Sequence, residues 1–170
     1  MLTMAAMDPA FGEVDLVIID IDGTLTDATI AWGGPDIGWT MSFSIRDGES
    51  IRRLGQHGVP VIPLSRNQTR CARVRMEGLG LACDWLGVTD KVSAFRDLLA
   101  RQAVPAARVA YLADGREDVP ILELVGLPLA VADAHPHAQR VAKYVTRARG
   151  GEHAFEEVAD LIFAARGWDA

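Results

Sequence analysis

The apolar run Leu16–Ile19 constrains the fold more than any other feature of the chain, because it is continuous and mostly β-branched. Runs of this kind are typical of strands that are buried on both faces. Such strands belong to parallel sheets that helices cover on either side. We therefore expect the run to form a strand of an α/β fold.

Further strands and helices alternate along the chain, as the hydrophobic pattern and the turn residues indicate. The expected strands cover residues 59–64, 81–86, 108–112, 128–132 and 143–145. The expected helices begin at an N-cap Asp47, at residue 68, at an N-cap Asp90, at residue 119, at Pro136 and at residue 154. Residues 29–32 and 42–45 are expected to form a hairpin. This order predicts a Rossmann-like three-layer α/β/α sandwich with a central parallel sheet, whose ligands bind past the carboxyl ends of the strands.

Composition excludes several classes of protein. The 170 residues are 49% hydrophobic and 24% charged, which is typical of a globular protein, and we expect a single domain over residues 1–170 with a flexible N-terminal arm over 1–13. The net charge of −6 argues against a nucleic-acid partner. No apolar run approaches the ~18 residues that span a bilayer, and no signal peptide begins the chain. We expect a cytoplasmic protein with no membrane partner and with Cys71 and Cys83 reduced.

Two acids follow the first strand directly. Asp20 and Asp22 are two residues apart, so in extended chain both side chains point to the same side. Two carboxylates in one small site repel each other unless a cation neutralises them or one holds a proton. Gly23 would let the backbone turn sharply after them. Alone, the pair is better explained as a polar turn at the end of a strand.

Other polar residues fall at the ends of later strands or at the helix starts that follow them. Ser65 precedes a helix, Lys91 opens one, and Asp114 and Asp118 follow the strand over 108–112. Each has an ordinary structural interpretation: a helix N-cap for Ser65, a surface cation for Lys91, a first-turn acid for Asp118. Together they indicate phosphoryl transfer. Carboxylates suit Mg²⁺, a lysine and a hydroxyl would spread the phosphoryl charge, and one aspartate could attack phosphorus.

The motif DIDGTLTD, which contains Asp20 and Asp22, resembles the first motif of the haloacid dehalogenase superfamily. Ser65, Lys91 and the Asp114/Asp118 pair fall in the order of its second, third and fourth motifs. From about residue 14 to residue 163 the chain is similar to one branch of that superfamily, the 3-deoxy-D-manno-octulosonate 8-phosphate phosphatases. The similarity rests on SIRDGESIRRL, LGVTDK, AYLADGREDVP, VADAHPHAQRVAKYVT and the Gly150-Gly151 turn.

The resemblance implies a role for each motif residue. Asp20 would be the nucleophile and a Mg²⁺ ligand. Asp22 would protonate the leaving sugar oxygen and then activate water, while its backbone carbonyl also binds Mg²⁺. Asp114 would complete the metal site, and Asp118 would hold that site or its waters in place. Ser65 and Lys91 would grip the phosphoryl group.

The motif spacing and the resemblance together imply a protein without a cap domain. Residues 23–64 and 92–113 are each shorter than the roughly 50 residues that a separate domain needs. Relatives of this type assemble as homotetramers, in which the hairpin and a neighbour's C-terminal segment cover the active site. Trp32 and Trp39 on the hairpin fit such a contact, although exposed or intrachain packing is an equal alternative.

Several positions depart from the branch. Its second motif reads Thr-Gly-Arg and this chain has Ser-Arg-Asn over 65–67, while its fourth motif reads Gly-Asp-Asp and here Gly115 follows Asp114. Met41 and Glu152 occupy positions where the branch carries basic residues. The candidate substrate contacts are Thr24, Arg46, Arg66, Asn67, Glu152 and His153. His135 and His137 could suggest zinc, but a structural turn is the better interpretation.

The leading hypothesis is therefore a Mg²⁺-dependent phosphomonoester hydrolase. It would act on a small phosphorylated sugar or sugar acid through an aspartyl-phosphate, as the octulosonate phosphatases do. One alternative is a phosphatase for another long-chain sugar, such as a nonulosonate 9-phosphate. A second is a receiver-type signalling domain, which the early position of Lys91 disfavours. A third is a catalytically silent scaffold related to the domain fused to sialic acid cytidylyltransferases.

Overall fold

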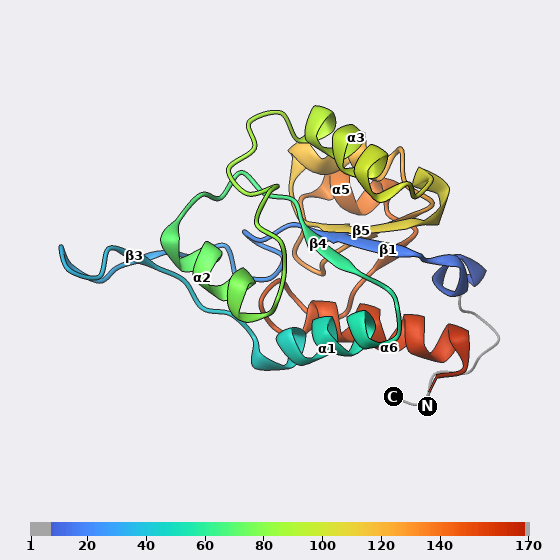
Figure 1. Cartoon of the computed structure of the whole chain (residues 1–170), viewed down its shortest axis with the longest axis horizontal. Helices are drawn as coiled ribbons and strands as arrows, with labels where there is room; N and C mark the ends of the chain where they lie inside the picture. Colours follow the sequence, from blue (N-terminus) through green and yellow to red (C-terminus); the bar gives the residue numbers. More distant parts are fainter. Residues whose placement is uncertain (1–7, 169–170) are drawn as a thin grey trace.

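A five-stranded parallel sheet forms the centre of the molecule, for which the computed structural model describes residues 8–168 (Figure 1). The strand order is β4-β1-β5-β6-β7. The strands are β1 (Leu16–Ile19), β4 (Val61–Pro63), β5 (Val109–Ala113), β6 (Leu127–Ala130) and β7 (Tyr144–Val145). Ile18 of β1 pairs with Ile62 on one side and Tyr111 on the other. Every residue of β1 is 0% exposed, which confirms the strand expected there.

Helices cover both faces of the sheet, as a three-layer sandwich requires (Figure 1). On one face α1 (Ile45–Gln56) lies beside α6 (Ala154–Arg166). On the other lie α3 (Lys91–Gln102) and α5 (Pro136–Val141), with the short α4 (Val119–Leu122) in contact with both. α2 (Arg70–Gly78) follows β4. Among residues 8–168, no helix has the length and apolar character needed to cross a membrane.

Two predicted elements near the hairpin are wrong in position. The second hairpin strand, expected over 42–45, is β3 (Trp39–Thr40), which pairs with β2 (Ala31–Trp32). The N-cap of α1 is Ser44 and not Asp47, because the Ser44 hydroxyl accepts a hydrogen bond from the Asp47 backbone N–H at 3.2 Å. Serine and aspartate are comparable N-caps, so sequence preference alone does not choose between them.

The strand expected over residues 81–86 is absent. This segment is irregular over 81–83, turns at 84–85 and has one parallel bridge, between Ser65 and Leu86. Leu86 is the segment's one buried residue, so the segment has an apolar anchor but no apolar face to bury. The other strands lie within a few residues of their predicted bounds, and Asp90 caps α3 as expected.

Within the N-terminal arm expected over residues 1–13, residues 9–13 are attached to the rest of the molecule. Residues Pro9–Glu13 form a 3-10 helix, η2, which Asp8 caps and which packs against α6. Phe11 is 1% exposed and its ring meets that of Tyr144 edge to face, with centroids 5.8 Å apart. A buried aromatic ring therefore fixes this part of the arm. Residues 1–7 lie outside the described residues.

The hairpin β2–β3 projects away from the sheet (Figure 1). Trp32 and Trp39 pair across it with ring centroids 5.1 Å apart, yet their exposed fractions are 57% and 51%. The hairpin and α1 are the only regular elements described between β1 and β4, so no cap domain is inserted there.

Candidate active site

The carboxyl ends of β1, β4 and β5 bring three of the predicted site residues to one edge of the sheet. Asp20 follows β1, Asp114 follows β5, and Ser65 comes two residues after β4. Ile19 pairs with Leu112 on one side and Pro63 on the other, so the three loops leave the sheet side by side. This is the edge at which the sequence places the chemistry.

Lys91 lies buried between two carboxylates. Its Nζ is 2.8 Å from Asp20 Oδ2 and 2.8 Å from Asp118 Oδ1, and its side chain is 4% exposed. Burial alone would lower the pKa of Lys91, but the two carboxylates raise it above its usual range. Lys91 is therefore an ammonium group that holds Asp20 in a fixed position.

Asp118 is fully buried and all its hydrogen bonds are made within the chain. Its Oδ1 accepts hydrogen bonds from Lys91 Nζ and from the Tyr111 hydroxyl at 2.6 Å, and its Oδ2 accepts one from the Gly115 backbone N–H at 3.1 Å. Tyr111 is a participant that sequence reasoning missed, because its position in a buried strand gives no signal beyond hydrophobicity. Both oxygens of Asp118 are thus occupied, and its contact with Lys91 positions that side chain.

A metal ion fits between the acids. Asp20, Asp114 and Asp118 each offer an oxygen within 4.8 Å of the others. Asp118 accepts three hydrogen bonds, whereas Asp20 accepts from the Ile21 N–H and Lys91, and Asp114 accepts from Thr24 alone among the described residues. Burial raises the pKa of Asp20 to about 7 although Lys91 opposes the shift, and burial with the nearby Asp118 raises the pKa of Asp114 to about 6. A divalent cation would stabilise the ionised form of both. Hard carboxylate oxygens are the ligands that Mg²⁺ prefers.

These pKa shifts predict how stability depends on pH in metal-free protein. Because both folded-state pKa values lie above the unfolded values near 4, the stability that Asp20 and Asp114 contribute is complete below pH ~4. It is lost as the pH rises through about 6 to 7. We expect the thermal midpoint in EDTA to fall between pH 5 and pH 8, and added Mg²⁺ to raise it more at pH 8 than at pH 5. A NaCl control at equal ionic strength should show no such difference, and a Mg²⁺ effect independent of pH would contradict the prediction.

Asn67 bonds to both Asp22 and Ser65, through its side chain and its backbone respectively. The Asn67 amide nitrogen is 2.8 Å from Asp22 Oδ1, and the Asn67 backbone N–H donates to Ser65 Oγ at 3.1 Å. Ser65 is 1% exposed and its hydroxyl hydrogen remains available to an acceptor such as a phosphoryl oxygen. Asp22 is half-buried and therefore accessible to a substrate.

The candidate substrate contacts separate into two groups. Thr24 Oγ1 is 3.5 Å from Asp114 Oδ1, and Arg66 forms an exposed ion pair of 3.1 Å with Glu117, just ahead of Asp118. Three others are not joined to the Asp20 cluster by any hydrogen bond or ion pair among residues 8–168. Instead Arg46 pairs with Glu156 at 2.9 Å, His153 meets Ser44 at 2.9 Å, and the Glu152 backbone bonds to Arg149.

The two histidines of the HxH motif form a structural turn. The Nδ1 atom of His135 accepts a hydrogen bond from the His137 backbone N–H at 3.1 Å and so caps α5. The two rings meet edge to face with centroids 4.9 Å apart. Neither ring belongs to the metal-competent group found among the described residues.

The Gly150–Gly151 turn packs against the loop that carries the two first-motif acids. A Cβ on Gly150 would lie 1.9 Å from the Gly23 carbonyl oxygen, and the Gly151 N–H donates to the Thr24 carbonyl at 3.0 Å. Gly151 also has φ +73°, a conformation that favours glycine. The sequence marked this turn as characteristic but did not reveal its contact with residues 23–24.

We expect Gly150→Ala to displace the loop over residues 23–24, because the contact at Gly150 is with backbone and cannot be relieved by a rotamer change. The substitution should lower the free energy of unfolding by about 1–3 kcal/mol and reduce any turnover at this site. Gly55→Ala is the matched control, since nothing lies within 4 Å of its Cβ position and α1 is helical there. Gly55→Ala should stabilise the fold slightly. Equal unfolding midpoints for the two variants would contradict the prediction.

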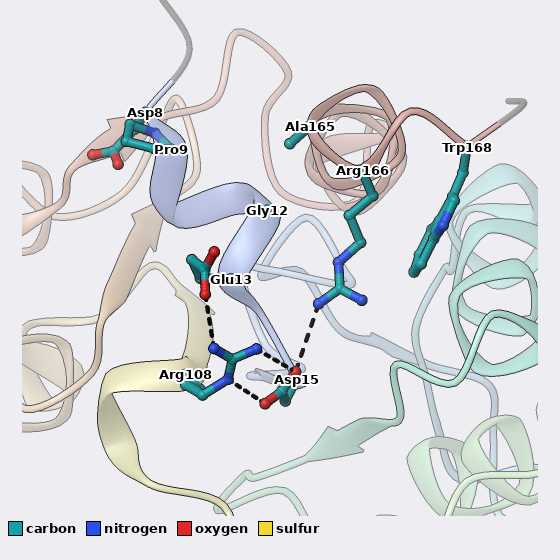
Figure 2. A pocket seen from close by; sticks show the side chains of 9 residues that line it. All are labelled: Asp8, Pro9, Gly12, Glu13, Asp15, Arg108, Ala165, Arg166 and Trp168. Carbon is teal, nitrogen blue, oxygen red and sulfur yellow. Dashed lines mark hydrogen bonds and ion pairs between the residues drawn. The ribbon is translucent and has the colours of Figure 1, made fainter.

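A separate cavity lies at the amino ends of the strands, beside the residues that precede β1 and β5 (Figure 2). Its charged groups pair with one another. Arg108 binds Glu13 at 2.7 Å and also binds Asp15, while Arg166 Nη2 is 3.6 Å from Asp15. These pairs tie η2 and α6 to the start of β5. The cavity contains none of the predicted catalytic residues.

The sequence of this chain is similar to those of known hydrolases of one family. A family model described as haloacid dehalogenase-like hydrolase matches residues 87–151. The 3-deoxy-D-manno-octulosonate 8-phosphate phosphatase KdsC of Escherichia coli K12 is 38% identical over 156 residues, which cover 91% of this chain and 81% of that protein.

Solved structures agree over nearly the whole chain. The crystal structure of 3-deoxy-D-manno-octulosonate 8-phosphate phosphatase from Yersinia pestis has a TM-score of 0.88 and 35% identity, over 93% of this chain and 85% of that one. A cobalt-bound deoxy-D-mannose-octulosonate 8-phosphate phosphatase from Haemophilus influenzae has a TM-score of 0.87 and 32% identity, over 93% and 92%.

Proposed function

The chain belongs to the haloacid dehalogenase-like hydrolases and is a phosphatase, and on this premise we propose that it hydrolyses a phosphorylated sugar acid of the 3-deoxy-D-manno-octulosonate 8-phosphate type through an aspartyl-phosphate. The observation that carries the proposal is the buried cluster of Asp20, Asp118 and Lys91 beside Asp114. The relatives named above for this activity are 32–38% identical to the chain over the aligned residues.

In the proposed reaction Asp20 and Asp22 act in sequence. An Asp20 carboxylate oxygen attacks phosphorus, the phosphorus–oxygen bond to the sugar breaks, and Asp22 gives its proton to the leaving oxygen. Asp22, now ionised, takes a proton from a water molecule whose oxygen attacks the phosphorus of the aspartyl-phosphate. Inorganic phosphate leaves, and Asp20 is regenerated as the carboxylate with Asp22 again protonated.

Other side chains would stabilise the transferring phosphoryl group. Lys91 and the Ser65 hydroxyl would donate hydrogen bonds to its oxygens. Asp20, Asp114 and the backbone carbonyl of Asp22 would hold Mg²⁺, which would offset the negative charge of the phosphoryl group and of the two carboxylates. Mn²⁺ could take the same place, because it accepts the same oxygen ligands.

Met41 favours a second substrate of the same class. Its sulfur lies 3.9 Å from the Asn67 amide nitrogen, so a thioether faces the site where the octulosonate phosphatases would offer a cation. A thioether neither pairs with a carboxylate nor donates a hydrogen bond. This observation supports a change of substrate within the class, for which a nonulosonate 9-phosphate or a related long-chain sugar phosphate is the second candidate.

Phosphate release from a panel of esters tests the proposal. The panel contains octulosonate 8-phosphate, nonulosonate 9-phosphates, hexose phosphates and p-nitrophenyl phosphate, each with Mg²⁺ and with EDTA. Mg²⁺-dependent turnover highest on octulosonate 8-phosphate supports the first candidate, and highest turnover on a nonulosonate phosphate supports the second. A folded protein that binds no Mg²⁺ and releases no phosphate would favour the silent scaffold instead.

We also propose that the chain forms a homotetramer in which neighbouring subunits cover the active site. The support is the exposed apolar surface of the hairpin, formed by Ile30, Trp32, Ile37 and Trp39, which are 51–70% exposed. Apolar patches of this kind mark protein–protein contacts. Light scattering on purified protein gives the assembly state directly, and a monomer at micromolar concentration would contradict the proposal.

A further inference from the structure

The start of α2, which follows Asn67 in the chain, holds the Asn67 side chain in one orientation. Its Oδ1 accepts hydrogen bonds from the Thr69 backbone N–H at 2.8 Å and from Thr69 Oγ1 at 2.7 Å. A backbone N–H can only donate, so this oxygen must face Thr69 and the amide NH₂ must face the other way. Thr69 is in turn the N-cap of α2, accepting from the Ala72 N–H. The direction of the Asn67 amide is therefore fixed by the start of a helix.

The backbone of Asn67 is equally constrained. Its N–H donates to Ser65 Oγ at 3.1 Å, and its carbonyl accepts from the Gly87 N–H at 3.0 Å. Asn67 is thus attached to Ser65 before it, to Thr69 after it and to Gly87 from a distant loop. Such multiple attachment keeps a side chain within the small positional tolerance that catalysis requires.

The NH₂ group donates to Asp22. The distance from Asn67 Nδ2 to Asp22 Oδ1 is 2.8 Å, and within residues 8–168 this is the one hydrogen bond that the Asp22 carboxyl group makes. It occupies Oδ1, and Oδ2 has no partner among the described residues. The other neighbour of the NH₂ group is Met41 Sδ at 3.9 Å, a weak acceptor that does not compete for it.

We propose that Asn67 is a positioning residue that fixes the Asp22 carboxyl group, so that Oδ2 gives and takes the proton in the two halves of the reaction. The inference rests on the proposed function, because it assigns Asn67 a task only if Asp22 is the acid and base. Without the amide, the Asp22 side chain could rotate about two bonds, and a misplacement of about 1 Å can cost on the order of a hundredfold in rate.

The test compares two classes of leaving group, using Asn67→Ala and wild type with Mg²⁺. A sugar alkoxide leaves only if it is protonated, whereas p-nitrophenolate leaves without a proton. The value of kcat/KM reports the steps through departure of that group. We expect Asn67→Ala to lower kcat/KM about 10- to 100-fold on the preferred sugar phosphate and less than about threefold on p-nitrophenyl phosphate. Because water activation also needs Asp22, the variant should release a burst of p-nitrophenol equal to the enzyme concentration.

Two further variants separate the effect on catalysis from any effect on folding. Asn67→Asp keeps an acceptor for Thr69 but replaces the amide that donates to Asp22 with a carboxylate that repels it, so it should keep the loop attached to Thr69, release Asp22 from its fixed position and show the same split between substrates. Gln68→Ala changes the exposed neighbour, for which no side-chain hydrogen bond exists among residues 8–168, and should leave both kcat/KM values unchanged. Thermal unfolding of each variant measures the structural effect separately.

The remaining outcomes overturn the inference. An equal loss on both substrates without a burst would indicate a merely structural role. A rise in KM for the sugar phosphate at unchanged kcat would make Asn67 a substrate contact, the role that the sequence suggested. Wild type that hydrolyses neither ester would overturn the proposed function and the role of Asn67 with it, whereas active wild type with unaltered variants would overturn the role of Asn67 alone.

Discussion

Asp20→Asn is expected to abolish phosphate release from every ester, with kcat lower by ~10⁴-fold or more. The amide cannot attack phosphorus, so no covalent intermediate can form and the acid–base group at Asp22 has nothing to act on. The two side chains are nearly equal in size, and Lys91 keeps its 2.8 Å contact with Asp118, so the site should stay assembled. Phosphate release and kcat/KM, measured with Mg²⁺ on the preferred sugar phosphate, check this prediction.

Asp27→Asn is the matched control for Asp20→Asn. Asp27 belongs to the same acidic motif, but it is exposed and its carboxylate bonds to Thr29 and not to the cluster. Its replacement should leave turnover near the wild-type value. Retention of more than about a tenth of wild-type kcat in Asp20→Asn would mean that another group is the nucleophile.

The sequence was sufficient to locate the acids, because their positions follow from topology. Residues that come after parallel strands must meet at one edge, and the pairing of β1 with β4 and β5 brings Asp20, Ser65 and Asp114 to that edge. Lys91 joins them because Asp90 caps its helix as the pattern indicated. Fold class and the location of the site are therefore accessible from periodicity and strand ends alone.

The contacts between loops were not accessible in that way. Asn67 reaches Asp22 and Gly150 lies against Gly23, and both contacts join parts of the chain that no local pattern relates. Tyr111 lies in β5 only seven residues before Asp118, but its place in a buried strand gives no sign that its hydroxyl bonds there. Two misplaced elements, the cap of α1 and the strand over residues 81–86, are wrong because the local sequence allows more than one structure there. Ser44 and Asp47 are comparable helix caps, and residues 81–86 have enough apolar character for a strand but bury one side chain.

The charges at this site explain why one lysine matters to both folding and chemistry. Asp20 and Asp118 are buried and share a single ammonium group, with Asp114 close by, so the metal-free cluster carries more negative than positive charge. The raised pKa of Asp20, about 7, and of Asp114, about 6, follows mainly from burial and reflects the cost of that excess. A bound cation would reduce the excess of negative charge in the cluster, whereas a bound phosphoryl group would increase it.

Lys91→Met should therefore be the most destabilising substitution at the site. It keeps the length of the side chain but leaves Asp20 and Asp118 buried without a counter-charge, which costs about 3–5 kcal/mol of unfolding free energy near pH 8. Because burial raises the pKa of Asp20 to about 7, protonation of Asp20 removes part of the buried charge, and the deficit relative to wild type should shrink as the pH falls from 8 towards 5. Turnover should be lost at every pH, since the cation that contacts Asp20 is gone.

Urea unfolding of both proteins at pH 5 and pH 8 measures this deficit, and Lys143→Met is the matched control. Lys143 is exposed and its Nζ bonds to the Gly126 carbonyl at 2.8 Å, so the same substitution there removes no buried counter-charge. It should change the unfolding free energy little at either pH. A Lys91→Met deficit that is equal at the two pH values would show that lost packing and not unpaired carboxylates causes it. The pH-dependent difference between the two lysine variants is thus the direct measure of the charge that Lys91 balances.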